Sequence, residues 1–130
     1  MGQPAAKKGD KITAIDTHLV VVPSPPSPAP LPHPFAGIIN GGLSGDVNIM
    51  GMPAATVNST ADNTPAHVPT PPGTSFSSPP SNEGTIKIGS PTVKINGKAA
   101  ARNGDAAETC NDPSDALVGT VVAVGTVLIG

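Results

Sequence analysis

Three histidines and one cysteine are the residues of this chain best suited to bind a metal ion: His18, His33, His67 and Cys110. Imidazole nitrogen and thiolate sulfur are the donors that tetrahedral zinc sites use, and iron accepts the same donors. Four protein ligands leave no open coordination position for water or substrate. The residue types therefore predict one structural ion, zinc or alternatively iron, with these four residues as its ligands.

The spacing of these ligands follows an internal repeat, whose three copies are Pro4–Asp10, Pro53–Ser59 and Ala99–Asp105. The copies begin 49 and then 46 residues apart. His18 and His67 each lie eight residues after the end of a copy, and Cys110 lies five residues after the end of the third. Three copies around a pseudo-threefold axis would bring these ligands together, with His33 supplied by a proline-rich segment.

Short strands are expected before the repeats. In Val47–Gly51 and Val93–Gly97, valine and isoleucine stand two residues apart and therefore share one strand face. The first copy begins too close to residue 1 to have such a strand. Val127–Gly130 is predicted to supply it, which would make the two termini neighbours in space. The alanines at 99–101 lie between two Asn-Gly turns, so a turn is expected there rather than a helix.

The apolar tail at 116–130 is predicted to form two short buried strands. A membrane anchor is the alternative interpretation of this tail, although ~20 apolar residues are needed to span a bilayer. The N-terminus lacks the apolar core of a signal peptide, so synthesis in the cytoplasm is expected.

Proline and glycine dominate the composition, with 17 prolines, 15 glycines and two aromatic residues, both phenylalanine. Such a chain buries little apolar surface, so a bound metal would supply stability that a thin core lacks. We predict one all-β domain over 1–130, with almost no helix and with ordered proline-rich loops at 23–34 and 65–80. The alternative is a mobile polyproline segment, which would make the chain a binding or adaptor module.

Charge and motif content argue against several other functions. The net charge is −2, and no basic cluster favours a nucleic-acid partner. A single cysteine cannot form an internal disulfide. A cysteine nucleophile at Cys110 beside Asn111 and Asp112 is an alternative, but no nucleophile elbow or activating helix is indicated. Gly37–Gly51 lacks the Lys-Ser/Thr of a phosphate loop. We expect no enzymatic activity.

The repeats resemble a known family. Ile86–Asp105, IKIGSPTVKINGKAAARNGD, is similar to a full repeat of the proline-alanine-alanine-arginine (PAAR) proteins. Pro4–Asp10 is close, with Lys7 where arginine is usual, and Pro53–Ser59 keeps only Pro-Ala-Ala. The resemblance implies a small cone of β-hairpins with pseudo-threefold symmetry. Its broad base would bind the end of a trimeric spike, and its apex would hold a metal.

The resemblance also implies a site and a role. His18, His67 and Cys110 match the family's metal site by position, and His33 would complete it. PAAR proteins are the sharp tips of contractile injection systems: type VI secretion systems, extracellular injection particles and phage-like tails. The implied partner is a trimeric spike protein of the VgrG or phage-hub type, capped by one copy of the chain per trimer. Neither a nucleic acid nor stable membrane anchoring is implied.

The tip would be a monomer on its own and would help to pierce the target envelope when the sheath contracts, leaving the cell as part of the particle. Some family members carry effector cargo, whereas this sequence, which ends shortly after its last expected strand, resembles a stand-alone tip. Its length and proline-rich loops favour an extracellular particle or a tail-like system.

Overall fold

The computed structural model describes residues 2–130, and this part of the chain contains no helix. Its strands are β1 (Gln3–Pro4), β2 (Lys11–Val21), β3 (Ala29–Gly41), β4 (Asn48–Ile49), β5 (Met52–Pro53), β6 (Thr60–Asn63), β7 (Ser75–Phe76), β8 (Glu83–Ile86), β9 (Lys94–Ile95), β10 (Lys98–Ala99), β11 (Ala106–Thr109), β12 (Ala116–Val122) and β13 (Leu128–Ile129). Within residues 2–130 no helix is long and apolar enough to cross a membrane. The predicted all-β class is confirmed.

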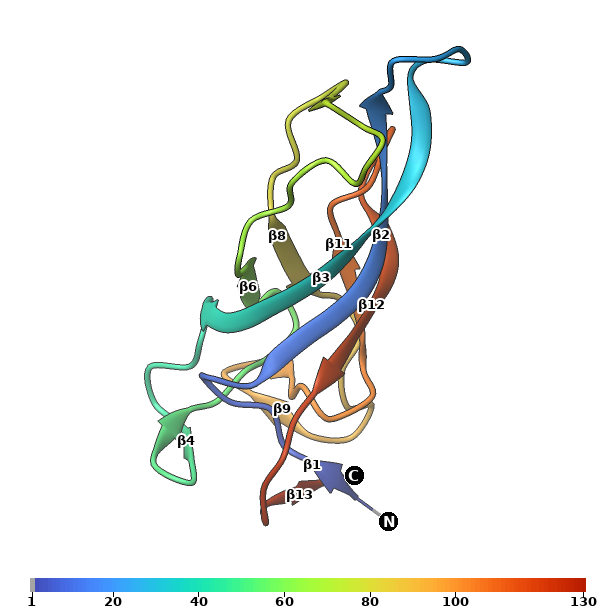
Figure 1. Ribbon diagram of the computed structural model, residues 1–130. Helices are drawn as coiled ribbons and strands as arrows, with labels where there is room; N and C mark the ends of the chain where they lie inside the picture. Colours follow the sequence, from blue (N-terminus) through green and yellow to red (C-terminus); the bar gives the residue numbers. More distant parts are fainter. Residues whose placement is uncertain (1) are drawn as a thin grey trace.

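A small closed barrel forms the middle of the molecule (Figure 1). Three antiparallel pairs, β2–β3, β6–β8 and β11–β12, are joined edge to edge, and β12 pairs with β2 to close the circle. Closure leaves no free edge along the paired segments. Inward side chains from each pair fill the interior, among them Ile12, Phe35, Ile86 and Val121. The barrel is the rigid frame on which the candidate site is built.

Three short strand pairs, two of them hairpins and the third formed by the two terminal strands, make a second layer at one end of the barrel (Figure 1). They are the two-stranded sheets β4–β5, β9–β10 and β13–β1. The first two turn at Met50-Gly51 and Asn96-Gly97, where both residues have positive φ, as a tight hairpin turn requires. In the third, Gln3 pairs with Ile129, which confirms that the terminal strands are neighbours. We call this end the hairpin layer.

A ring of backbone hydrogen bonds joins the three repeat copies. The amide of Ala6 donates to the carbonyl of Ala101 (2.9 Å), the amide of Ala101 to the carbonyl of Ala55 (3.1 Å), and the amide of Ala55 back to the carbonyl of Ala6 (3.0 Å). All three alanines are fully buried. The cyclic order of these bonds is the pseudo-threefold arrangement that the repeat spacing predicts. Because the three backbones approach one another so closely, a larger side chain at any of these positions would have to displace a neighbour.

The first and third copies end in the same charged turn. The Asp10 carboxylate accepts hydrogen bonds from the amide (3.0 Å) and the ammonium (3.1 Å) of Lys7. The Asp105 carboxylate accepts from the amide (2.7 Å) and the guanidinium (2.8 Å) of Arg102. These hydrogen bonds raise the pKa of Arg102 above its ordinary value. Each carboxylate therefore holds the turn and the basic side chain together.

The second copy forms the same turn without charge. The Ser59 hydroxyl accepts the amide of Thr56 (2.9 Å) and donates to the carbonyl of Gly42 (2.8 Å). Asn58, at φ 78°, stands where the other copies have Gly9 at 95° and Gly104 at 90°. Asparagine is among the few residues that tolerate this left-handed conformation. The copy that departs most from the family pattern thus keeps its backbone geometry.

One predicted loop is wrong in part. Residues 29–34 belong to β3 and pair with β2 rather than forming the end of a loop at 23–34. Pro30, Pro32 and Pro34 occupy alternate positions on the exposed face of the strand. Residues two apart on a strand also direct their backbone nitrogens to the same side, and for these prolines that side is the one away from β2. The missing N–H proton of each proline therefore costs no hydrogen bond to β2. Alternate prolines are compatible with a strand where consecutive ones are not.

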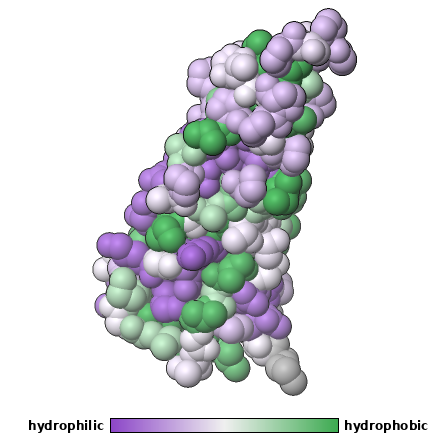
Figure 2. Space-filling view, viewed as in Figure 1, coloured by the Kyte–Doolittle hydropathy of each residue, from purple (hydrophilic) through white to green (hydrophobic). Residues whose placement is uncertain are grey.

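The apolar tail forms the two predicted strands, β12 and β13, but their burial differs from the prediction. In β12, Val121 is fully buried, whereas Leu117 and Val118 are about half exposed. The strand lies on the barrel wall, so only one of its faces meets the interior. The molecule tapers from the hairpin layer toward the end where β2 and β3 project beyond the barrel (Figure 2).

Candidate metal centre

The three histidines meet at the end of the barrel opposite the hairpin layer. His18 lies on β2, His33 on β3 and His67 in the segment that follows β6. Their ring centroids are 5.0 Å apart for His18–His67, 5.3 Å for His18–His33 and 5.5 Å for His33–His67. Cys110, directly after β11, joins the group. Residues separated by up to 92 positions in the sequence are therefore brought to one place, as the repeat spacing predicts.

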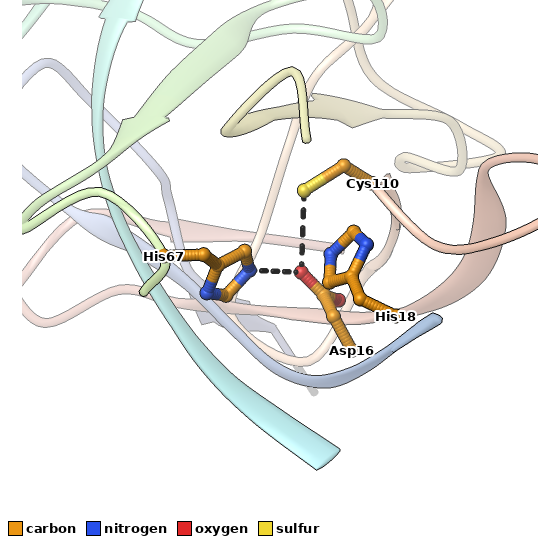
Figure 3. Close-up of side chains that lie close together, drawn as sticks. All are labelled: Asp16, His18, His67 and Cys110. Carbon is orange, nitrogen blue, oxygen red and sulfur yellow. Dashed lines mark hydrogen bonds and ion pairs between the residues drawn. The ribbon is translucent and has the colours of Figure 1, made fainter. Parts of the chain in front are cut away.

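Four side chains place donor atoms close enough to share one ion. Asp16, His18, His67 and Cys110 each offer an atom, and these atoms all lie within 4.8 Å of one another (Figure 3). Asp16, His18 and Cys110 are buried, and the side chain of His67 is 3 % exposed. A carboxylate, two imidazoles and a thiol form a donor set that zinc and iron accept.

The imidazole of His18 tests whether these residues fit a metal ion. Neither of its ring nitrogens has a hydrogen-bond partner within residues 2–130, and both are buried. The closest ionic group is the Asp112 carboxylate, 3.4 Å from Nδ1. A buried polar atom left unpaired costs about 1–3 kcal/mol. An ion in the cluster would take the lone pair of one nitrogen, so the residues fit a bound metal.

Asp16 is the member of the cluster that the sequence analysis missed. Its Oδ2 lies 2.9 Å from Nε2 of His67 and 3.5 Å from Sγ of Cys110. Its Oδ1 accepts hydrogen bonds from the Thr109 hydroxyl and the Asn111 amide. The signal in the sequence is Asp16-x-His18, since residues two apart on a strand share a face. Without the strand assignment, one aspartate among nine acidic residues gives no such signal.

His33 lies beside the four donors but uses its nitrogens elsewhere. Its Nδ1 is 2.9 Å from the carbonyl oxygen of Leu31, and its Nε2 accepts the amide of Thr70 at 3.1 Å. Burial lowers the pKa of His33, against the raising effect of the Leu31 carbonyl. The ring also packs on Phe76, with centroids 5.3 Å apart. Its predicted role as a ligand stays a prediction.

Cys110 is in a poor setting for a nucleophile. Burial, and after it the negative charge of the nearby Asp16 carboxylate, raises the pKa of its thiol to about 11. A thiol of this kind is protonated at neutral pH and closed to substrate. Its environment therefore argues against the cysteine-nucleophile alternative. A cation in the cluster would instead favour the thiolate and relieve its repulsion with the carboxylate.

Comparison with protein families agrees with the geometry. The PAAR motif matches residues 30–108, more than half of the chain, and spans the second and third repeat copies. No curated protein sequence matches the chain. The family profile, the threefold ring of backbone bonds and the buried cluster rest on different observations and point to one assignment. The chain belongs to the PAAR-motif family.

Proposed function

We propose that this protein caps the trimeric central spike of a contractile injection system. The observation that carries the proposal is the threefold hairpin layer at the broad end of the molecule. Its backbone bonds repeat in the order first, third and second copy, so one chain presents three similar surfaces. A monomer with this symmetry can contact three identical subunits in equivalent ways. The expected stoichiometry is one chain per spike trimer.

The surface of the hairpin layer suits such a contact. Buried apolar residues from each hairpin, among them Ile49, Ile95 and Ile129, pack together beneath it. Apolar side chains also project outward, since Met50 is 53 % exposed and Leu128 is 57 % exposed. Each strand pair of the layer is a separate two-stranded sheet, and the edges of such sheets can pair with strands of a partner. Exposed apolar groups and strand edges are both features of protein interfaces.

At the opposite end, the proposed metal stabilises the tip. His18 and Cys110 come from β2 and the end of β11, and His67 comes from the segment after β6. An ion bound by them would cross-link all three thirds of the barrel where the molecule is narrow. Zinc is the ion we propose, with iron as the alternative, because both accept nitrogen and sulfur donors. A tip stiffened in this way would resist bending while it pierces a target envelope.

Metal content and stoichiometry test the proposal together. The purified chain is analysed for metals, and its complex with the cognate spike trimer is weighed by native mass spectrometry. We expect one zinc or iron ion per chain and one chain per trimer. A chain that binds neither ion after reconstitution would contradict the metal role. Three chains per trimer would contradict the capping geometry.

Single substitutions locate the contact surface. Leu128→Glu places a charge on the hairpin layer, whereas Val68→Glu places one near the metal cluster, where Val68 is 73 % exposed. We expect Leu128→Glu to weaken spike binding at least ~10-fold, since a charge against an apolar interface costs more than about 1.4 kcal/mol. Val68→Glu should bind like the unmodified chain. If Val68→Glu weakened spike binding and Leu128→Glu did not, the spike would contact the end with the metal cluster, and the proposed orientation would be contradicted.

A further inference from the structure

The two edges of β3 are paired over different lengths. The strand has 13 residues, and one of its edges pairs with β2 over residues 29–38. Its other edge, which we call the outer edge, pairs with β6 only over residues 37–41. The remainder of the outer edge runs into the part of β3 that projects beyond the barrel together with β2 (Figure 1). A long strand edge without a partner strand is a place where another chain can add a strand.

Hydrogen bonds show which residues direct their backbone groups to the outer edge. The N–H and C=O of one residue point to the same edge of a strand, and successive residues alternate between the two edges. Ala36 donates its amide to the Asn63 side chain (2.9 Å), and its carbonyl accepts the amide of Thr64 (3.1 Å). The carbonyl of Pro32 accepts the hydroxyl of Thr70 (2.7 Å). The even-numbered residues of this segment therefore face away from β2.

Beyond Ala36, the next three residues that face the outer edge are all proline: Pro34, Pro32 and Pro30. Proline has no backbone N–H, so this part of the edge offers carbonyl acceptors and no donor. A residue of an incoming antiparallel strand exchanges two N–H···O bonds with the residue opposite it. Opposite each proline it would form one bond at most, and its own carbonyl would lose a partner. The outer edge is therefore a poor template for strand addition where β6 no longer covers it.

The corresponding edge of β2 is closed in a different way. The amide of Thr17 donates to the Asn111 side chain (2.6 Å), and the amide of Leu19 donates to the Asp112 carboxylate (2.8 Å). Further along the strand, β7 pairs with β2. The donors of this edge are present and are given partners, whereas the donors of the outer edge of β3 are removed. Both sides of the projecting hairpin are thus protected against a further strand.

We infer that the alternate prolines of β3 prevent a second copy of this chain from pairing with the outer edge. A second copy is the partner to consider because it carries the same long edge. Two identical edges can pair antiparallel about a twofold axis, so that each residue meets its counterpart symmetrically. The prolines keep this end of the molecule from joining copies of the chain in this way. The inference depends on neither the spike nor the metal of the proposed function.

A triple variant with Pro30→Thr, Pro32→Thr and Pro34→Thr tests the inference by sedimentation equilibrium. Threonine restores the N–H groups and favours strands, and all three side chains are exposed, so no core contact is lost. The control variant carries three substitutions at exposed prolines outside β3: Pro23→Thr, Pro71→Thr and Pro79→Thr. We expect the triple variant to self-associate at least ~10-fold more tightly than the control, because each restored donor adds a hydrogen bond. The control should behave like the unmodified chain, as a monomer.

Hydrogen exchange measured by mass spectrometry locates the contact. In the triple variant, residues 29–36 should become more protected as the protein concentration rises, and the hairpin layer should not change. A folded triple variant that stays monomeric would overturn the inference, as would equal association of the control or association without protection of residues 29–36. Protection of this segment that rises with concentration in the unmodified chain would also overturn it, because the edge would then be open despite its prolines. If the triple variant does not fold, the double variant Pro30→Thr, Pro32→Thr takes its place with the same expected outcome.

Discussion

The hairpin layer and the end that carries the candidate metal centre are stabilised in different ways. In the hairpin layer, three copies of one short segment meet through identical backbone bonds, and small alanines allow the backbones to approach. At the other end, each third of the barrel contributes something different: Asp16 and His18 from the first, His67 from the second and Cys110 from the third. Symmetry therefore holds in the backbone of one end and is lost in the side chains of the other.

The difference agrees with the role that we propose for each end. A surface that meets a symmetric trimer benefits from equivalent contacts, which a repeated backbone provides. A narrow end has no room for an apolar core, so specific polar chemistry has to hold it together. The two ends should accordingly respond to different perturbations, and experiments can test how independent they are.

Metal removal should give the largest effect and should be confined to one end. At a free-metal concentration of 1,000 times Kd, the ion stabilises the folded state by about 4 kcal/mol. For a domain of this size, chelation should lower Tm by roughly 10–20 °C. Hydrogen exchange measured by mass spectrometry should speed up in β2, in residues 64–74 and around Cys110, and should change little in the hairpin layer. Equal acceleration at both ends would show that the two ends unfold as one unit.

Replacing one alanine of the hydrogen-bonded ring by a larger residue should destabilise the hairpin layer. Ala101→Leu places a larger side chain where three backbones meet and where Ala101 is fully buried. Overpacking of this kind costs about 1–3 kcal/mol, and the hairpin layer has little room to relax. Chemical denaturation should report the loss, whereas zinc affinity should stay within about threefold. Ala66→Leu, at an exposed position, is the control and should change stability by less than about 0.5 kcal/mol.

The hairpin layer was predictable because its signals are local. Val93 and Ile95 two residues apart, followed by Asn96-Gly97, define a strand and a tight turn without reference to the rest of the chain. The pairing of β1 with β13 followed from the repeat register, since the first copy had no strand before it. The ring of alanine bonds confirms the symmetry that the repeat spacing predicted.

The chemistry of the metal end was harder to predict because it depends on pairing across the sheet. The sequence placed His18, His67 and Cys110 together through their offsets from the repeat. The sequence gave no sign that Asp16 joins them, because its hydrogen-bond partners Thr109 and Asn111 are more than 90 residues away. The strand at 29–34 was missed because a proline-rich segment usually forms a loop. Its prolines fit a strand only because they stand at alternate positions, where the missing N–H groups do not face the paired strand.

The second repeat copy offers a smaller test of how the symmetric end tolerates variation. Ser59→Ala removes the group that accepts the Thr56 amide and donates to the Gly42 carbonyl. The buried Thr56 amide would lose its acceptor and the part-buried Gly42 carbonyl would lose a donor, which should cost about 1–3 kcal/mol. Thermal unfolding with metal present measures the loss. Ser78→Ala, at an exposed position, is the matched control, and an equal effect of the two substitutions would remove the structural role assigned to Ser59.

The smallest effect is expected at the positive-φ position that the three copies share. Asn58, Gly9 and Gly104 adopt φ of 78°, 95° and 90°. A Cβ added at Gly9 or Gly104 would meet nothing within 4 Å, so only the backbone conformation opposes a side chain there. Alanine at any of the three positions should cost about 1 kcal/mol. Asn58→Gly, by contrast, should change the free energy of unfolding by less than about 0.5 kcal/mol, because both residues adopt this conformation at low cost.

Denaturant titrations of Asn58→Ala, Gly9→Ala, Gly104→Ala and Asn58→Gly measure these differences directly. Agreement among the three alanine variants within about 0.5 kcal/mol would mean that the copies are energetically equivalent at this turn, although the second has lost its charged pair. A much larger cost at Gly9 or Gly104 than at Asn58 would mean that the turns with Lys7–Asp10 and Arg102–Asp105 are more rigid than the neutral one. The symmetry of the hairpin layer would then extend to its geometry and not to its stability.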